Sequence, residues 1–222
     1  MNSKHKKIKT PWPTKKAMQQ VYEKQLWGSN KTLFYSGEGS HQKEIVEPYT
    51  KSLIEFLKAF PKPSTLCDLG CGDFNVGQQL LPYISQYIGI DIVPELIEHH
   101  KGKYESENIM FDCKDLAKDS LPPANCAILR QVLQHLSNVE IQAILKKLVQ
   151  YQYVIITEHI PLGSFEPNKD IISGQGIRLK KGSGVVIQEA PFCFEFKTSK
   201  ELNTVLLENG NGKIQTVLYA MY

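Results

Sequence analysis

The chain has 222 residues, of which 41% are hydrophobic and 22% are charged, and its formal net charge is +3. These values are typical of a soluble globular domain that is long enough to bury a full hydrophobic core. The five cysteines include no CxxC pair, which argues against a disulfide framework or a zinc site and favours a reducing, cytoplasmic location. The sequence predicts no transmembrane helix, because no run of 18 apolar residues is present.

Residues 1–16 form a basic segment. They contain six lysines and no acidic residue, so the rest of the chain is slightly acidic. We interpret them as a flexible tail. The alternative is contact with nucleic acid or another acidic surface, which the acidic body of the protein disfavours. No apolar segment follows the lysines, as a secretory signal would require.

Residues 17–44 differ in composition from both neighbours. Helical spacing in the first half is followed by WGSNKTLFYSGEGS, which is rich in glycine, serine and aromatic residues. This second half either packs Trp27, Phe34 and Tyr35 onto the core or forms a lid with glycine hinges and aromatic faces for a cation. A helix is predicted over residues 41–60, ended by Pro61 and Pro63.

Residues 65–91 contain the motif that organises the chain. A short apolar strand over residues 65–69 carries Asp68, and two glycines follow at Gly70 and Gly72. A helix is expected to start around Asn75, and a second strand over residues 87–90 leads to Asp91. Glycines allow backbone to approach a ligand closely, and an acid at the end of the second strand can accept hydrogen bonds from ribose. The pattern therefore predicts a βαβ unit that binds a nucleoside.

The spacing of Asp68, Gly70 and Gly72 resembles the first motif of class I S-adenosylmethionine-dependent methyltransferases, an acid followed by GxGxG. Phe74 replaces the third glycine of that motif. A dinucleotide fingerprint would need glycine in place of Asn75 and no carboxylate at position 68, so a nicotinamide dehydrogenase is disfavoured. The resemblance implies S-adenosyl-L-methionine as cofactor, with Asp91 on its ribose and with Asp112 and Cys113 on its adenine. Its full set of expected cofactor contacts is Asp68, Gly70, Gly72, Asp73, Asn75, Asp91, Ile92, Asp112, Cys113, Arg130 and Gln131.

Strands and helices alternate through the following segment. Strands are predicted over residues 108–112, 124–130 and 153–157, and an S-x-x-E capping box at Ser137 and Glu140 begins a helix. Adjacent His99 and His100 are interpreted as surface residues. The alternation predicts an α/β fold with a doubly wound, mostly parallel sheet, for which the resemblance implies seven strands in a Rossmann-like methyltransferase arrangement.

Three residues are candidates for a general base: His135, Glu158 and His159. They follow the fourth and fifth predicted strands, at the edge of the sheet where ligands bind in open α/β folds. A base is needed only if the methyl acceptor must lose a proton. The sequence leaves the three unranked, and His135 could equally pack beneath the ligand.

Residues 160–198 interrupt the alternation and are expected to form a β-rich insertion on the substrate side. A helix over residues 199–208 and a strand over 213–221 then close the fold, with residues 192–196 as the candidate for the remaining strand. The expected domain organisation is a tail (1–16), a cap or lid (17–44) and a methyltransferase domain (45–222). The residues expected to contact substrate are Trp27, Tyr35, Arg130, Asp170 and Arg178.

The chain also resembles a group of small bacterial class I methyltransferases, some of which are found beside glycosyltransferases. We therefore expect methyl transfer to an oxygen or nitrogen nucleophile of a small-molecule or saccharide-like acceptor, with no membrane partner. Two alternatives stay open: a non-catalytic protein that binds S-adenosylmethionine, and an RNA or protein methyltransferase that uses the lysine-rich tail. The sequence does not predict an oligomeric state.

Overall fold

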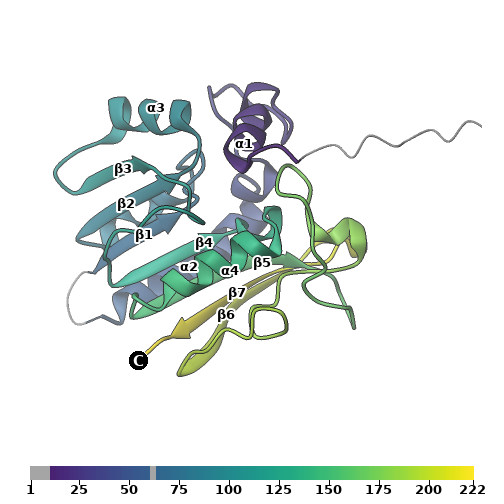
Figure 1. The fold of residues 1–222 in the computed structure, drawn as a ribbon. Helices are drawn as coiled ribbons and strands as arrows, with labels where there is room; N and C mark the ends of the chain where they lie inside the picture. Colours follow the sequence, from purple (N-terminus) through teal and green to yellow (C-terminus); the bar gives the residue numbers. More distant parts are fainter. Residues whose placement is uncertain (1–10, 61–63) are drawn as a thin grey trace, which may run out of the picture.

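The computed structural model describes residues 11–60 and 64–222, and its central feature is one seven-stranded sheet (Figure 1). The order of the strands is β3-β2-β1-β4-β5-β7-β6, in which the first five are parallel and β7 is antiparallel to both β5 and β6. The strands are β1 (Thr65–Leu69), β2 (Gln86–Asp91), β3 (Ile109–Cys113), β4 (Cys126–Arg130), β5 (Tyr153–Ile160), β6 (Thr198–Leu206) and β7 (Lys213–Ala220). The predicted sheet is confirmed.

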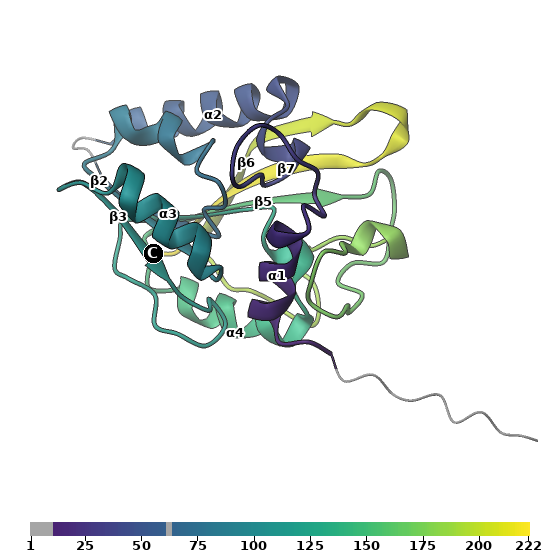
Figure 2. The same ribbon diagram turned by 90° about the horizontal axis from the view of Figure 1, so that it is seen from above.

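Helices cover both faces of the sheet, with α2 on one face and α4 on the other (Figure 2). The four α-helices are α1 (Thr14–Glu23), α2 (Lys43–Lys58), α3 (Pro94–Tyr104) and α4 (Asn138–Leu148). Short 3-10 segments are η1 (Glu38–Ser40), η2 (Gly77–Tyr83), η3 (Leu133–His135), η4 (Arg178–Lys181) and η5 (Glu208–Gly210). The predicted capping box at Ser137 and Glu140 is present and begins α4.

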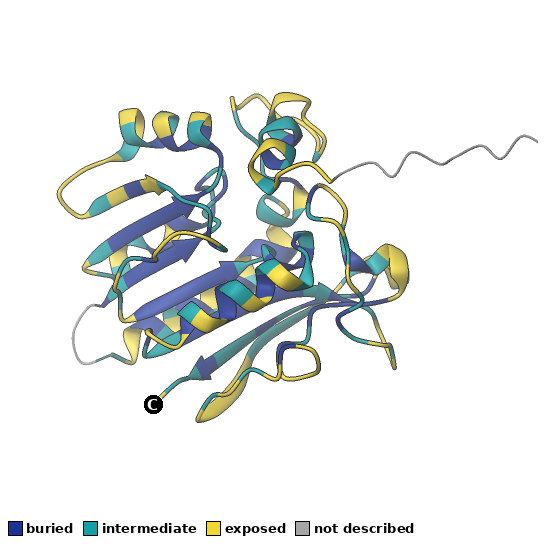
Figure 3. Cartoon of the chain, viewed as in Figure 1, coloured by how far each residue is buried: buried dark blue, intermediate teal, exposed yellow. Residues whose placement is uncertain are grey.

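The hydrophobic core consists of two clusters, which alternate along the strands. In β4, Cys126 and Ile128 belong to the cluster under α2, whereas Ala127 and Leu129 belong to the cluster under α4. Side chains of a strand point alternately to the two faces, so a strand covered on both faces must be apolar throughout. Figure 3 shows the central strands as buried along most of their length.

Three local predictions are wrong. The segment expected as a helix over residues 199–208 is the edge strand β6, because it pairs with β7 and lies against α2. The insertion forms no strand between β5 and β6. Residues 192–196, expected as a strand, instead begin in a turn in which Phe192 N–H and Cys193 N–H both donate to Glu189 O. His100 is buried, not on the surface, since its Nε2 lies 2.7 Å from Gly72 O.

The chain between β1 and β2 contains the 3-10 segment η2 in place of the expected α-helix, and Pro82 lies inside it. The glycine turn itself is tightly packed. Gly70 has φ +87°, and Phe74, which replaces the third glycine of the motif, also has a positive φ, of +65°. No helix in the described ranges is both long and apolar enough to cross a membrane.

We predict that Gly70→Ala lowers the free energy of unfolding by at least about 2 kcal/mol, since the residue keeps a left-handed conformation and its new Cβ would lie 2.4 Å from Val132 Cγ2. The matched control is Gly102→Ala in α3. No atom lies within 4 Å of its Cβ position, and alanine is the better helix former, so this change should stabilise by about 0.5–1 kcal/mol. Urea unfolding followed by circular dichroism measures both, and equal effects would contradict the close packing at Gly70.

Candidate functional site

A cavity of about 430 Å³ lies at the carboxyl ends of the parallel strands, with α1 beyond them (Figure 1). This size is ordinary for a small-molecule site. Its floor is made by residues that follow β1, β2 and β4, and its roof by the N-terminal segment and the insertion. The cofactor residues predicted from the sequence that line it are Asp68, Gly70, Gly72, Asp91, Ile92, Arg130 and Gln131.

The turn after β1 is held by the end of β2. Gly70 N–H and Cys71 N–H donate to Ile90 O, and Gly72 N–H donates to Asp91 Oδ2 at 3.2 Å. Asp91 Oδ1 accepts from Val93 N–H at 3.1 Å. Burial raises the pKa of Asp91, and these backbone donors oppose the shift. Asp91 thus has a fixed orientation at the cavity wall, where it can accept hydrogen bonds from a pair of hydroxyl groups.

Asp68 lies beneath the same turn. Its carboxyl is buried and accepts a hydrogen bond from Tyr87 Oη at 2.7 Å. Burial raises the pKa of Asp68 to about 6, although the bond from Tyr87 and the positive charge of Arg130 lower it. The acid therefore contributes negative charge to the cavity at neutral pH.

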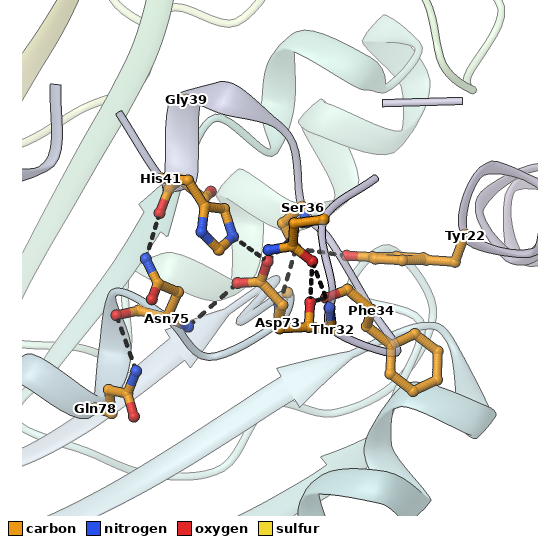
Figure 4. A network of polar contacts seen from close by, with 12 residues as sticks. Tyr22, Thr32, Phe34, Ser36, Gly39, His41, Asp73, Asn75 and Gln78 are labelled. Atoms are coloured by element: carbon orange, nitrogen blue, oxygen red, sulfur yellow. Dashed lines mark hydrogen bonds and ion pairs between the residues drawn. The ribbon is translucent and has the colours of Figure 1, made fainter. Parts of the chain in front are cut away.

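The N-terminal segment is fastened to the glycine turn through Asp73 (Figure 4). Ser36 N–H donates to Asp73 Oδ2 at 2.7 Å, and His41 Nε2 lies at the same distance from this oxygen. In return Asp73 N–H donates to Ser36 Oγ at 2.8 Å. Asn75 Nδ2 donates to Ser40 O at 2.7 Å. Asp73 and Asn75 thus secure the segment over the cavity and are not among the residues that line it.

Two buried donors lie unused at the end of β4. Arg130 stacks on Tyr49, 5.0 Å from the ring centroid, and donates to Gly39 O and to Ser40 Oγ, yet its Nε has no partner among the described residues. Within the same ranges Gln131 Nε2 also lacks a partner, and Gln131 has φ +57°. Unpaired buried donors cost free energy, so two of them together fit the binding of an oxygen-bearing anion such as a carboxylate.

Of the three candidate bases, His135 and His159 line the cavity and Glu158 does not. The ring of His135 packs on Trp27 with centroids 5.0 Å apart, and no residue in the described part of the chain hydrogen-bonds to its Nδ1. Burial lowers the pKa of His135 to about 4, so the ring is neutral at physiological pH. His159 Nε2 donates to Asn211 O at 2.6 Å, and burial lowers its pKa as well.

Glu158 lies beneath the cavity, and both oxygens of its carboxyl group are hydrogen-bonded to backbone N–H groups. It accepts hydrogen bonds from Leu133 N–H at 3.0 Å and from Gln134 N–H at 2.9 Å. Burial raises the pKa of Glu158 to about 8, against the opposing effect of these two donors and of Arg178.

The roof of the cavity joins the N-terminal segment to the insertion. Gln175 Nε2 donates to Leu26 O at 2.8 Å. On the other side, the carboxylate of Glu140 accepts hydrogen bonds from three hydroxyl groups, those of Thr14, Ser137 and Ser173. One acid therefore connects α1, α4 and the insertion at one side of the cavity.

Several predicted residues lie elsewhere. Asp112 is exposed and pairs with Lys114 at 3.1 Å, because β3 runs one residue further than expected and turns this side chain away from the cavity. Cys113 packs against Ile92 O. Among the expected substrate residues, Trp27 and Arg130 line the cavity. Tyr35 stacks on His41, Asp170 accepts from Asn138 N–H, and Arg178 is buried behind the cavity.

The sequence reasoning missed several cavity residues. Asp115 and Leu116 line the cavity next to Ile92, where the adenine contacts of Asp112 and Cys113 were expected. Their signal was present in the same DCKDL string, three residues further along. The missed contributions from helices are Met18, Tyr22, Tyr49 and Ile144, whose apolar spacing indicates only that they face inward.

Comparison with known proteins identifies relatives of this arrangement. A family model described as a methyltransferase domain matches residues 41–169, more than half of the chain. An uncharacterized RNA methyltransferase of Chlamydia pneumoniae is 26% identical over 149 residues, which are 58% of this chain and 34% of that protein. The chain thus spans about a third of the length of this curated relative.

Solved structures share the fold. The N-methyltransferase NodS from Bradyrhizobium japonicum, in complex with S-adenosyl-L-homocysteine, has a TM-score of 0.66 at 12% identity and covers 92% of this chain and 98% of its own. Magnesium protoporphyrin IX methyltransferase from Synechocystis, also with bound S-adenosylhomocysteine, has a TM-score of 0.62 at 14% identity, with coverage of 93% and 95%.

We predict that Glu158 makes the protein less stable as pH rises above neutrality. Its pKa is about 8 in the folded state against 4.5 for the free side chain, so folding takes up a proton between these values and the stabilisation is lost as pH rises through 8. His135, whose pKa falls from 6.5 to about 4, has the opposite effect, but only below pH 6.5. Between pH 6.5 and 8 the free energy of unfolding should fall by about 1–2 kcal/mol.

Urea titrations across this pH window check the expectation, with Glu158→Gln as the comparison. The variant is less stable overall because it loses a buried hydrogen bond, but its stability should not depend on pH in the window. Parallel pH profiles for the wild type and the variant would show that Glu158 is ionised throughout.

Proposed function

The chain belongs to the methyltransferase-domain family, and from that premise we propose that it transfers the methyl group of S-adenosylmethionine to an oxygen or nitrogen nucleophile of a small-molecule acceptor, which includes saccharide-like compounds. The observation that carries the proposal is one cavity that joins the glycine turn and Asp91 to the ring pair of Trp27 and His135.

The residues present fit the cofactor. Asp91 is oriented to accept from ribose hydroxyls. The turn beside it needs glycine, because a side chain at Gly70 or Gly72 would collide with Val132 or Ser36. Ile92 and Leu116 offer apolar surface to adenine, and Asp115 a carboxylate for its amino group. The unpaired donors on Arg130 and Gln131 suit the methionine carboxylate.

When bound, S-adenosylmethionine supplies a methyl group that its sulfonium already activates, so the protein needs mainly to align the acceptor. The aromatic faces of Tyr22 and Trp27 line the cavity and suit both the sulfonium and a ring-shaped acceptor. Residues 17–44 act as the lid and residues 160–198 as the acceptor-side wall. Together they exclude water from the reacting groups.

His135 is the general base for a hydroxyl acceptor. It lines the cavity, it is neutral, and no described residue accepts or donates at its Nδ1. Both carboxyl oxygens of Glu158 already accept hydrogen bonds from backbone N–H groups, and His159 Nε2 already donates to Asn211 O. His135 is the better candidate because it lines the cavity and keeps one ring nitrogen without a partner among the described residues.

A second candidate function is methylation of RNA. Its support is the description of the Chlamydia relative as an RNA methyltransferase. A small acceptor is supported instead by the volume of the cavity, about 430 Å³, which is ordinary for a small-molecule site. Binding of RNA that weakens with salt and is lost on deletion of residues 1–16 would favour the second candidate. Residues 1–10 lie outside the described ranges.

The five free cysteines support the expected reducing, cytoplasmic location.

We predict that wild-type protein binds S-adenosylmethionine and S-adenosylhomocysteine and that Asp91→Ala weakens both by at least about tenfold, since each lost hydrogen bond to a charged acceptor contributes roughly 1.5–3 kcal/mol. Isothermal titration calorimetry measures this. Asp112→Ala is the matched control: the same residue type at the end of the next strand, outside the cavity, whose loss should leave affinity within about threefold. Failure of folded wild type to bind either ligand would overturn the proposed function.

We further predict that His135→Gln lowers turnover of a hydroxyl acceptor by about 100-fold or more, the usual contribution of a general base. Release of S-adenosylhomocysteine in a screen of small phenols, hydroxy acids and sugars measures the reaction. Wild-type turnover should not change between pH 6 and 8, since His135, with a pKa of about 4, is neutral throughout. An undiminished rate in the variant would exclude His135 as the base.

A further inference from the structure

The segment that follows β4, residues 131–136, contributes Gln131 and His135 to the cavity and depends on partners outside itself. Gln131 adopts a positive φ, which a residue with a side chain keeps only when its surroundings hold it there. The three residues of η3 are too few to satisfy their own N–H and C=O groups by helical hydrogen bonds. Several of these backbone groups find their partners on two buried, ionisable side chains.

The first partner is Glu158 on β5, which is 4% exposed. Its Oε1 accepts from Leu133 N–H at 3.0 Å and its Oε2 accepts from Gln134 N–H at 2.9 Å. The neighbouring His159 N–H donates to Gln134 Oε1 at 3.1 Å. The N–H groups of Leu133 and Gln134 are therefore hydrogen-bonded to a side chain of β5, which fixes the position of the segment relative to the sheet.

The second partner is Arg178, the first residue of η4 in the insertion, which is 1% exposed. Its Nη1 donates to Leu133 O at 3.1 Å and to Gln134 O at 3.3 Å, and its Nη2 donates to Leu136 O and to Asn138 Oδ1, both at 2.7 Å. Its Nε donates to Lys169 O at 3.0 Å. Within residues 11–60 and 64–222, Arg178 has no direct ion pair, and four of its five hydrogen-bond acceptors are backbone carbonyls.

Leu133 and Gln134 are consequently held at both their N–H and their C=O groups, between a carboxyl and a guanidinium. The insertion adds further bonds to the same segment. Gly174 N–H donates to His135 O at 3.0 Å, and Ser137 N–H donates to Ser173 Oγ at 2.7 Å. The insertion and the post-β4 segment thus form one hydrogen-bonded unit.

We propose that Arg178 and Glu158 are positioning residues for methyl transfer, which hold residues 131–136 so that His135 and Gln131 face the acceptor and the cofactor. The inference rests on the proposed function and adds to it a role for the insertion. Arg178 was expected from the sequence to contact substrate. The structure gives it contacts with the backbone that carries the base.

The identity of the side chain matters at position 178. A guanidinium presents five donors in a rigid, planar fork, and here the fork reaches carbonyl groups of four residues. A lysine ammonium keeps the positive charge but has three donors on one atom, which cannot reach the same carbonyls at once. Arg178→Lys therefore tests geometry at constant charge.

The test follows the His135 ring by NMR in full-length protein labelled with ¹⁵N-histidine and saturated with S-adenosylhomocysteine, so it needs no acceptor. The spectrum of His135→Gln identifies the signal. In wild type the ring should titrate with a pKa of about 4. In Arg178→Lys and in Glu158→Gln the pKa should rise towards the ordinary value of 6.5, because a loosened segment admits water to the ring.

Lys181→Gln is the matched control. It removes a positive charge from the same short element, but within the described residues Lys181 Nζ hydrogen-bonds only to Asp170 O, so the titration of His135 should not change.

Calorimetry with S-adenosylhomocysteine shows whether each variant is folded, and we expect affinities within threefold of wild type. Once an acceptor is known, kcat of Arg178→Lys and of Glu158→Gln should fall at least tenfold, with the KM for the cofactor unchanged.

A His135 titration that is unchanged in both Arg178→Lys and Glu158→Gln, with S-adenosylhomocysteine still bound, would overturn the positioning role and leave the proposed function intact. Failure of wild type to bind S-adenosylhomocysteine would instead remove the proposed function on which the inference rests. Because Glu158→Gln keeps one acceptor for the backbone, it gives a second, milder measurement if Arg178→Lys does not fold.

Discussion

The site depends on hydrogen bonds that two neighbouring acceptors at the end of β2 make with the turn after β1. Ile90 O accepts from Gly70 N–H at 2.7 Å and from Cys71 N–H at 2.9 Å, and Asp91 Oδ2 accepts from Gly72 N–H at 3.2 Å. Parallel pairing of β1 with β2 brings these acceptors to the turn. Asp91 therefore builds the turn and lines the cavity at once, and any change to it alters both.

The other walls of the cavity attach outward from this turn. Asp73 continues the turn and binds the N-terminal segment at Ser36 and His41. That segment meets the insertion at Gln175, and the insertion in turn holds the post-β4 segment through Arg178. The strands therefore set the position of the N-terminal segment and the insertion, and the insertion holds residues 131–136 at the cavity.

The sequence predicted what short-range pattern determines. Apolar strands, the glycine turn and the terminal acid Asp91 follow from residues close in the chain. Residues 199–208 fit both a helix and a strand, and pairing with β7 decides for the strand. The register of β3 turns Asp112 outward and leaves Asp115 at the cavity. His100 is buried because it reaches Gly72 O, a contact between residues 28 positions apart that adjacency to His99 does not reveal.

The matched family region and the acceptor-side walls of the cavity are largely different parts of the chain. The family model covers residues 41–169, which include the glycine turn, Asp91 and His135. It leaves out α1, Trp27 and the part of the insertion that carries Gln175 and Arg178. These outer segments close the roof and hold the post-β4 segment. The family match therefore covers the glycine turn and Asp91, whereas Trp27, Gln175 and Arg178 lie in segments outside it, and the shared fold does not by itself fix the acceptor.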